Sequence, residues 1–353
     1  MQSEYEIANN FQEVEIKYIK LLAKQIKEIG KMSPANLNRF KILLKAGANI
    51  RELNKELKKA TNMSQKQLNA VYKASGISIF ELAREHFALP KTFTYVGLVQ
   101  GIANSTLKDL INISNTTSIQ KQYIKAIDKA VQEISLGISQ PEQVIRSILK
   151  EEANSGIKVR YKSGLTRRLD TAVRMNVKGG MNRLHAELQD KIGEEYGADG
   201  IEVSAHALCA PDHLFIQGRQ FTKEQFKKID ESLHRPIGEY NCYHYTINIK
   251  MGDTPAYTEE QLAELNRLAT EKVVIDGKER TRYDVSQMMR NLEYRMRLKK
   301  EQYIAFREVG DTEQMRMCKN DLKRIRNKYS EIAKIAGLEE ELWRAYVPDF
   351  IRR

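Results

Sequence analysis

The chain has 353 residues, and its 58 Lys and Arg outnumber its 46 Asp and Glu, which gives a formal net charge of +12. Hydrophobic residues at 41% and charged residues at 29% are typical of a globular protein rich in surface helices, so the composition excludes a largely disordered chain. No run of about 18 apolar residues occurs and the first residues are acidic, so we expect neither a membrane span nor a secretory signal.

The first part of the sequence predicts a small array of short helices. Apolar residues recur at three- and four-residue steps in the ranges 7–30, 33–47 and 64–76, and each range ends on a glycine that suits a helix C-cap. The second range opens on Ser-Pro, an N-cap followed by a first helical position, and Ser64 with Gln67 forms a potential capping box for the third. Three separate helices are therefore expected here.

Two connecting segments follow, and they are candidate domain boundaries. Pro90 begins a stretch containing Thr, Tyr and Gly that runs through Gly101, and Asn, Ser and Thr dominate the range 112–118. Further helices are predicted at 119–137 and from Ser139 onward.

The middle of the chain changes from a helical to a strand-like pattern. A helical face continues over 169–188, although it contains the pair Gly179-Gly180, which indicates close packing or a kink. Apolar and polar residues then alternate at 201–205 and at 245–249, which predicts two β-strands that enclose a long loop.

The last part of the chain predicts an antiparallel hairpin of two helices. Asp284 could cap the first helix, and Gly310-Asp311 supplies the turn into the second. The sequence as a whole therefore predicts a mainly α fold with a small α+β module of two strands and a long loop. The expected parts are a helical N-terminal region at 1–112, a helical segment leading into the α+β module at 113–255, and a basic helical hairpin with a C-terminal tail at 256–353.

Potential metal ligands are concentrated in two clusters beside the predicted strands. The first, SAHALCAPDH, contains His206, Cys209 and His213, and the second, NCYH, contains Cys242 and His244. If the two strands pair in antiparallel fashion, the clusters meet at one edge of the sheet. Cys209, His213, Cys242 and His244 could then hold a structural zinc ion, with His206 nearby. The alternative is a hydrogen-bonded core of Cys and His that steadies the long loop.

The same residues permit an enzyme, but the other parts of an active site are not recognised. Cys209 or Cys242 could act as a nucleophile activated by a histidine, or a metal-bound water could serve a nuclease. A Cys/His hydrolase would also need an orienting group and an oxyanion site, and a nuclease of the strand-strand-helix kind would need a ligand-bearing helix where His244 leads into a strand. The phosphate-binding pattern GxxxxGK[ST] is absent as well. We therefore predict no enzyme.

A basic segment precedes the predicted strands. Eight Lys and Arg face the single acid Asp170 within it: Lys158, Arg160, Lys162, Arg167, Arg168, Arg174, Lys178 and Arg183. Such a segment could bind double-stranded DNA non-specifically through its phosphates, or pair with acidic groups of a neighbouring subunit, and the sequence does not decide between the two. The ranges 290–297 and 319–328 of the helical hairpin are also basic, which indicates a solvated face or a partner surface.

Three runs carry a resemblance to a known family: YKSGLTRRLDTAVRMNV at 161–177, IEVSAHALCAPDHLFIQGRQF at 201–221 and NCYH at 241–244. Over nearly its whole length the chain resembles the phage minor capsid proteins of the second type, which are related more loosely to the head morphogenesis proteins of Mu-like and SPP1-like phages. The residues that match the family's pattern are His206, His213, Gln217, Gly218, Cys242 and His244. The run 209–212 and Tyr243 depart from that pattern.

The resemblance implies a structural minor component of a tailed bacteriophage head, at the portal vertex or in the capsid interior, that acts in head assembly or DNA packaging. The implied partners are the portal and capsid proteins, and the implied location is the virion, with the host cytoplasm during assembly. Ejection with the genome is a further implication that stays open. Two alternatives remain: a non-specific DNA-binding protein packaged with the genome, and a metal-dependent hydrolase or nuclease that uses the Cys/His clusters.

Overall fold

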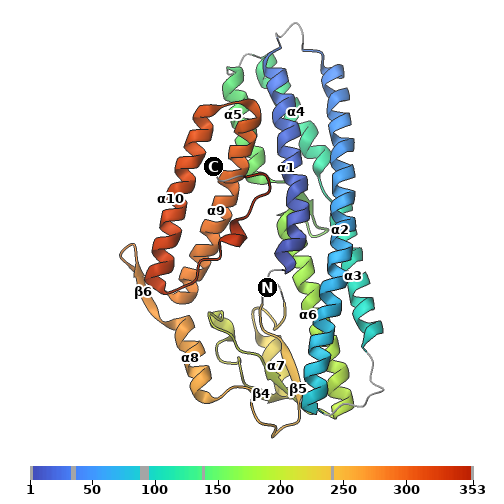
Figure 1. Cartoon of the computed structure of the whole chain (residues 1–353), viewed down its shortest axis with the longest axis vertical. Helices are drawn as coiled ribbons and strands as arrows, with labels where there is room; N and C mark the ends of the chain where they lie inside the picture. The colour runs from blue at the N-terminus through green and yellow to red at the C-terminus, as the bar shows by residue number, and fades with distance from the viewer. Residues whose placement is uncertain (1–2, 33–36, 88–94, 137–139, 240–241, 351–353) are drawn as a thin grey trace.

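The computed structural model describes residues 3–32, 37–87, 95–136, 140–239 and 242–350. Over these residues the chain is mainly helical and contains only small antiparallel sheets, which confirms the predicted fold class (Figure 1). None of the described helices combines the length and apolar character that a membrane crossing requires.

Two long helices form the N-terminal part of the molecule. Helix α1 spans Ser3–Gly30, and α2 spans Arg39–Phe87 as one uninterrupted helix of 49 residues. The predicted ends at Gly47 and Gly76 and the predicted start at Ser64 are therefore wrong. Each glycine costs a helix only about 1 kcal/mol, and the apolar face of α2 from Ile42 onward is buried along its length, so tertiary packing outweighs the local signals.

Ser64 has a different role from the one its sequence pattern predicts. It is fully buried, and its hydroxyl accepts a hydrogen bond from Asn10 Nδ2 of α1 at 3.2 Å. The expected helix start at Ser33-Pro34 lies outside the described residues.

Three further helices complete the bundle around α1 and α2. They are α3 (Val96–Asn115), α4 (Ile119–Ser135) and α5 (Pro141–Ser155). The connection predicted at 90–101 is wrong from residue 96 onward, because α3 begins there; residues 88–94 lie outside the described ranges. The connection at 112–118 shortens to the three residues after Asn115. The predicted signals at Gly137 and Ser139 also lie outside the described residues.

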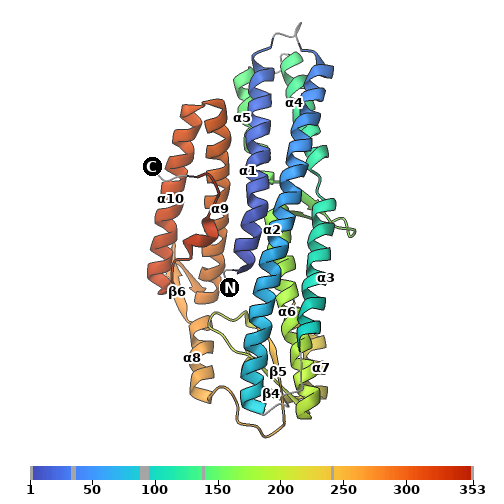
Figure 2. The same cartoon turned by 45° about the vertical axis from the view of Figure 1, so that its right-hand side comes forward.

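A β-hairpin that the sequence patterns did not predict follows α5. Strands β1 (Lys158–Arg160) and β2 (Thr166–Arg168) pair in antiparallel fashion, and the hairpin projects from the bundle between α3 and α4 (Figure 2). Helix α6 (Leu169–Tyr196) comes next and contains the predicted glycine pair. A Cβ atom on Gly180 would collide with Tyr72 of α2 and Thr106 of α3, so the pair marks close packing of three helices.

The α+β module lies at the end of the molecule where α6 finishes. Strand β3 (Gly200–Val203) pairs with β5 (Thr246–Ile249), as predicted, and a third strand, β4 (Gln220–Thr222), adds to its other edge. The long loop also holds a 3-10 turn, η2 (Pro211–His213), and helix α7 (Lys223–Ser232), neither of which was predicted. The sheet packs on α6, where the backbone N–H of Asn248 donates to Gln189 Oε1 at 3.1 Å.

The predicted helical hairpin forms the C-terminal part. Helix α8 (Glu259–Thr270) and strands β6 (Lys272–Ile275) and β7 (Lys278–Thr281) lead into α9 (Arg282–Val309) and α10 (Thr312–Ala336), with a 3-10 turn, η3 (Leu342–Ala345), after them. The N-cap of α9 is Thr281, and Asp284 is the capping-box partner rather than the cap itself. Gly310 adopts the left-handed conformation that the turn requires.

Helix α1 joins the two halves of the molecule. It packs against α2, α4, α5 and α6 of the bundle and against α9 of the hairpin, and α5 also contacts α9 (Figure 1). The largest hydrophobic core accordingly extends from α1–α6 to Ala305 and Phe306 of α9, and a second core lies between α9 and α10.

Candidate metal centre

The two Cys/His clusters meet at one edge of the β3–β5 pair. Because β3 and β5 are antiparallel, the residues after β3 lie beside those before β5, and the Ser204 N–H donates to the Tyr245 carbonyl at 2.9 Å. His213 comes from turn η2, whereas Cys242 and His244 come from the segment that enters β5. All three side chains are buried, so they face the protein interior.

Three donor atoms converge at the centre of this cluster. His213 Nδ1 lies 3.4 Å from His244 Nδ1 and 3.7 Å from Cys242 Sγ, and Cys242 Sγ lies 3.6 Å from His244 Nδ1. This is the one group of His, Cys, Asp and Glu among the described residues whose atoms are placed to hold a metal ion.

The outer nitrogen of each histidine ring is held by an oxygen atom. His213 Nε2 lies 2.7 Å from the Arg235 carbonyl oxygen, and His244 Nε2 lies 3.3 Å from Gln217 Oε1. Gln217 is itself fixed, because its Oε1 accepts from the His206 backbone N–H at 3.2 Å. Such outer partners orient metal-binding imidazoles in many proteins.

Cys209 and His206 lie beside the three converging atoms. Cys209 Sγ contacts the outer nitrogen of His244, Nε2, at 3.5 Å, and donates to the Ala210 carbonyl at 3.2 Å. The His206 ring stacks near that of His244, with centroids 4.3 Å apart, and its Nδ1 lies 2.8 Å from the Ala207 carbonyl. Of the five residues that the sequence singled out, three thus present a donor atom to one point.

The two buried cysteines differ in acidity. Burial raises the pKa of Cys209 to about 12, which keeps it a neutral thiol. Burial also disfavours the Cys242 thiolate, but the hydrogen bond with His213 and backbone hydrogen bonds outweigh it and lower the pKa of Cys242. Burial lowers the pKa of His244 to about 3, so its ring is neutral. Burial disfavours the charged form of His213, but its hydrogen bonds with Cys242 and the Arg235 carbonyl outweigh burial and raise its pKa. Thiolate sulfur and imidazole nitrogen are donors that zinc binds, and binding displaces their protons.

Some supporting groups were not recognised in the sequence. The Arg235 carbonyl is a backbone atom, so residue identity carries no signal for it. Asn266 of α8 accepts from Gln217 Nε2 at 2.6 Å and thereby fixes the amide, but an isolated Asn on a helix forms no pattern.

The eight basic residues of the predicted binding segment do not form one surface. Lys158, Arg160 and Lys162 are exposed on the β1–β2 hairpin and Arg167 is half-buried there. Lys178, by contrast, is buried with its Nζ over the ring of Tyr243.

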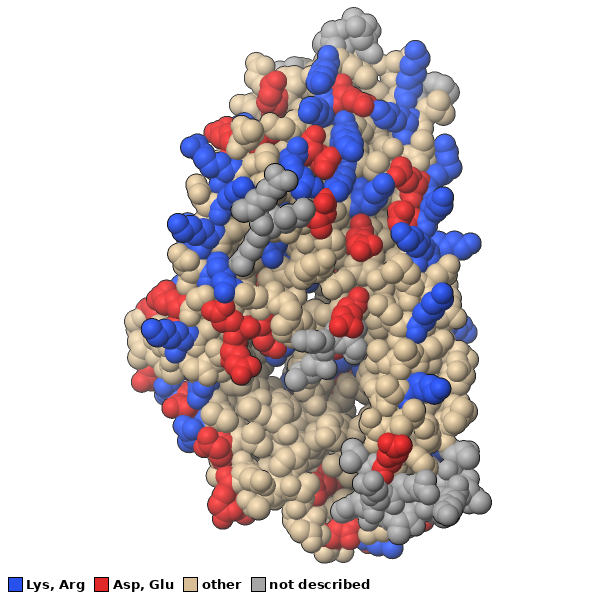
Figure 3. Space-filling view, viewed as in Figure 1, with Lys and Arg blue, Asp and Glu red and all other residues tan. Residues whose placement is uncertain are grey.

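The remaining members of the segment contact other side chains of the protein. Arg174 lies over the ring of Tyr5, and Arg183 pairs with Asp109 at 3.4 Å. Elsewhere on the molecule, Lys and Arg gather on the face of Figure 3 over the end where α10, α1 and the first half of α2 lie, interspersed with Asp and Glu.

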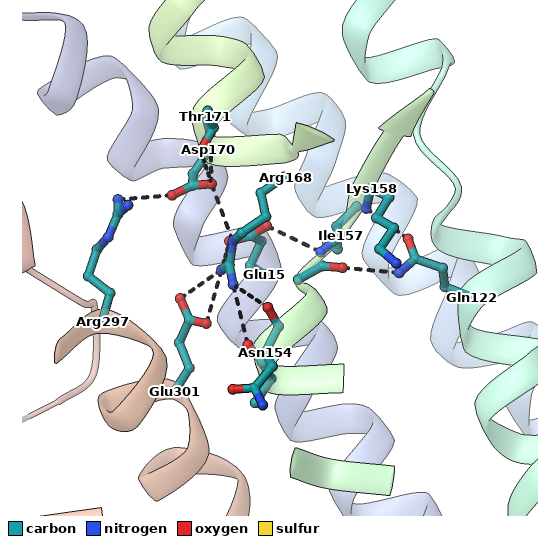
Figure 4. Close-up of polar contacts among 12 residues, drawn as sticks. Glu15, Gln122, Asn154, Ile157, Lys158, Arg168, Asp170, Thr171, Arg297 and Glu301 are labelled. Carbon is teal, nitrogen blue, oxygen red and sulfur yellow. Dashed lines mark hydrogen bonds and ion pairs between the residues drawn. The ribbon is translucent and has the colours of Figure 1, made fainter. Parts of the chain in front are cut away.

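Arg168 is the centre of a buried ion cluster. Its Nη2 donates to Glu15 of α1 at 2.8 Å and to both carboxylate oxygens of Glu301 of α9 at 2.9 and 3.0 Å (Figure 4). Asp170 completes the cluster and accepts from Arg297 of α9 at 3.0 Å. Arg168 therefore ties α1, α6 and α9 together.

The comparisons with known proteins give one family. The family model described as phage minor capsid protein 2 matches residues 4–332. No curated protein and no solved structure matches the chain. Because the family match runs from α1 into α10, it covers both halves of the fold and the Cys/His cluster. The chain belongs to the phage minor capsid protein 2 family.

Proposed function

We propose that the protein is a structural component of the head of a tailed bacteriophage, located at the portal vertex or in the capsid interior, and that it acts in head assembly or DNA packaging. The observation that carries the proposal is the family match over residues 4–332, which runs from α1 into α10 rather than covering one module. The expected partners are the portal and capsid proteins.

The rigid connection between the two halves of the molecule supports a structural role. Helix α1 contacts both the bundle and the helical hairpin, and the Arg168 cluster links the same parts through buried ion pairs. A body joined in this way can present surfaces to two partner subunits in a constant relative orientation.

The test is co-purification with the portal and major capsid proteins of the same phage. We expect a complex that survives about 1 M NaCl, where the Debye length falls to about 3 Å and purely electrostatic association is lost. A phage that lacks the gene should produce fewer filled heads, and a supplied copy should restore them. Normal heads without the protein would contradict the proposal.

We further propose that the metal centre holds a structural zinc ion. Thiolate and imidazole are the ligands that zinc prefers, and the converging residues connect the long loop to the start of β5. Elemental analysis of the purified protein should find about one zinc per chain, because such a site contributes its binding energy to folding. Protein that contains no metal and is equally stable with a chelator would contradict this assignment.

A second candidate function is non-specific binding of double-stranded DNA, and the β1–β2 hairpin favours it. Lys158, Arg160, Lys162 and Arg167 lie on a projecting hairpin, and no ion pair holds them among the described residues (Figure 2). Beside the hairpin is a cleft of about 620 Å³ between α2, α3 and α4, lined in part by Leu and Ile side chains. Its polar lining consists of Lys58 and several Asn, Gln, Ser and Thr side chains. These groups can donate to phosphate oxygens.

Replacing the four hairpin cations with Ala should weaken DNA binding and reduce its salt dependence. Each lost phosphate contact reduces the slope of log K against log salt by about 0.9, so we expect a reduction of up to about 3.6. The matched control removes four cations from α10, namely Arg316, Lys319, Lys323 and Lys334. An unchanged slope in the hairpin variant, or an equal loss in both, would rule out the hairpin as the DNA surface.

A further inference from the structure

The three converging atoms of the metal centre have the spacing of a zinc tetrahedron. With zinc–nitrogen bonds of about 2.0–2.1 Å and zinc–sulfur bonds of about 2.3 Å, two nitrogen ligands lie about 3.4 Å apart and a nitrogen and a sulfur about 3.6 Å apart. The observed separations are 3.4 Å between the nitrogens of His213 and His244, and 3.6 and 3.7 Å from those nitrogens to Cys242 Sγ. The three atoms thus define one face of a tetrahedral site.

The hydrogen bonds behind the rings determine which nitrogen carries the proton. The Arg235 carbonyl can only accept, so His213 Nε2 donates to it. Gln217 presents its oxygen to the His206 backbone N–H, which can only donate, so His244 Nε2 donates to that same oxygen. When both rings are neutral, as metal binding requires, each points an Nδ1 lone pair toward the other.

Three buried electron-pair donors this close together need a positive partner, either a proton or a metal ion. A single proton, on Cys242 Sγ or on His213 Nδ1, bridges only two of the three atoms, and an unsatisfied buried acceptor costs about 1–3 kcal/mol. A divalent cation at the shared point accepts electron density from all three atoms at once.

Cys209 is placed differently from the other three residues. Its Sγ contacts the outer nitrogen of His244, which lies on the opposite side of the ring from Nδ1. A metal ion bound at Nδ1 would lie about 4 Å from Nε2, so the Cys209 sulfur faces away from the ion unless the loop rearranges. No other described His, Cys, Asp or Glu supplies a fourth donor atom to this group.

We propose that the zinc ion is held by three protein ligands, His213 Nδ1, His244 Nδ1 and Cys242 Sγ, while Cys209 remains a thiol outside the coordination sphere. An oxygen donor such as water then takes the fourth position. This inference rests on the zinc assignment above and refines it, because it replaces the four-ligand Cys209, His213, Cys242 and His244 set that the sequence predicts.

The experiment replaces zinc with Co²⁺, whose thiolate charge-transfer absorbance counts sulfur ligands. The unmodified protein should show absorbance for one thiolate per cobalt. Cys209→Ser should keep that absorbance and lose less than about 100-fold in Co²⁺ affinity, as expected for an outer contact. Cys242→Ser should lose the charge-transfer band and at least about 100-fold in affinity.

The cysteine variants separate the possible failures. Absorbance for two thiolates in the unmodified protein, halved in Cys209→Ser, would establish Cys209 as a ligand and overturn the three-ligand site while leaving zinc in place. No binding of Co²⁺ or Zn²⁺ would overturn both. If Cys242→Ser does not fold, the absorbance of the unmodified protein and of Cys209→Ser still decides the question. None of these results depends on the proposed role in the phage head.

Discussion

Replacing Arg168 with Met is expected to lower the free energy of unfolding by about 3–5 kcal/mol. The substitution leaves Glu15 and Glu301 buried without their cation, and breaking a buried pair by removing one partner costs far more than losing an exposed one. The Arg168 Nη1 hydrogen bonds to the carbonyls of Ala153 and Asn154, at the end of α5, are lost as well. Chemical denaturation followed by circular dichroism measures the loss.

The matched control for this substitution is Arg167→Met. Arg167 is adjacent on β2 but only half-buried and has no ion pair among the described residues, so its replacement should change stability by less than about 0.5 kcal/mol. Adding Glu15→Met and Glu301→Leu to Arg168→Met should recover much of the loss, since apolar groups of similar size can replace a buried ion cluster. A stable Arg168→Met protein would show that the cluster does not join the helices.

The decrease in the free energy of unfolding caused by Arg168→Met should also depend on pH. Burial already raises the pKa of Glu15 to about 8 and raises that of Glu301, while Arg168 opposes the shift in both. Without Arg168 both folded-state pKa values rise further above the unfolded value of about 4.3. As pH rises through about 8, the folded unmodified protein releases the Glu15 proton while the folded variant keeps it, so the loss of stability should grow there and be larger at pH 9 than at pH 6.

Arg168 illustrates why charge patterns alone do not identify a surface. Within the sequence it is one of eight cations in a basic segment, and nothing local distinguishes it from Arg167. Its carboxylate partners are 153 and 133 residues away, on α1 and α9. Only the arrangement of the helices brings these charges together, so burial of this cation could not be inferred from its neighbours.

The predicted helix boundaries within α2 were wrong for a related reason. Gly47, Ser64 and Gly76 are signals that act within one turn, whereas the buried face of α2 extends over its whole length and is decided by contacts with other helices. The helical hairpin was predicted correctly because each of its helices carries a long apolar face and because Gly310 in the turn adopts a left-handed conformation. Local and tertiary preferences therefore agree there.

The meeting of the two Cys/His clusters was predictable in position but not in detail. The alternating residues before and after the long loop predict the β3–β5 pair, and antiparallel pairing then brings the two clusters together. Which atoms converge depends on the path of the loop through η2, which turns His213 inward and places Cys209 on the far side of His244. Residue spacing carries no information about that path.

Replacing Gly180 with Ala is expected to destabilise the protein by about 2–4 kcal/mol. A Cβ atom at this position would collide with the Tyr72 hydroxyl and with Thr106, and both residues are fully buried between α2, α3 and α6. The Tyr72 hydroxyl also donates to the Val177 carbonyl at 3.1 Å, and moving it breaks that hydrogen bond in the core.

The adjacent glycine provides the control. A Cβ atom on Gly179 meets nothing within 4 Å, so Gly179→Ala should raise stability by up to about 1 kcal/mol through helix propensity alone. Tyr72→Phe removes the colliding hydroxyl, and we expect it to recover part of the loss in the Gly180→Ala background while destabilising the unmodified protein. Equal stability of the two alanine variants in thermal and chemical denaturation would mean that α6 does not contact α2 and α3 as closely as the structure places them. A Gly180→Ala variant that is less stable than Gly179→Ala would therefore show that α2, α3 and α6 are in close contact at Gly180.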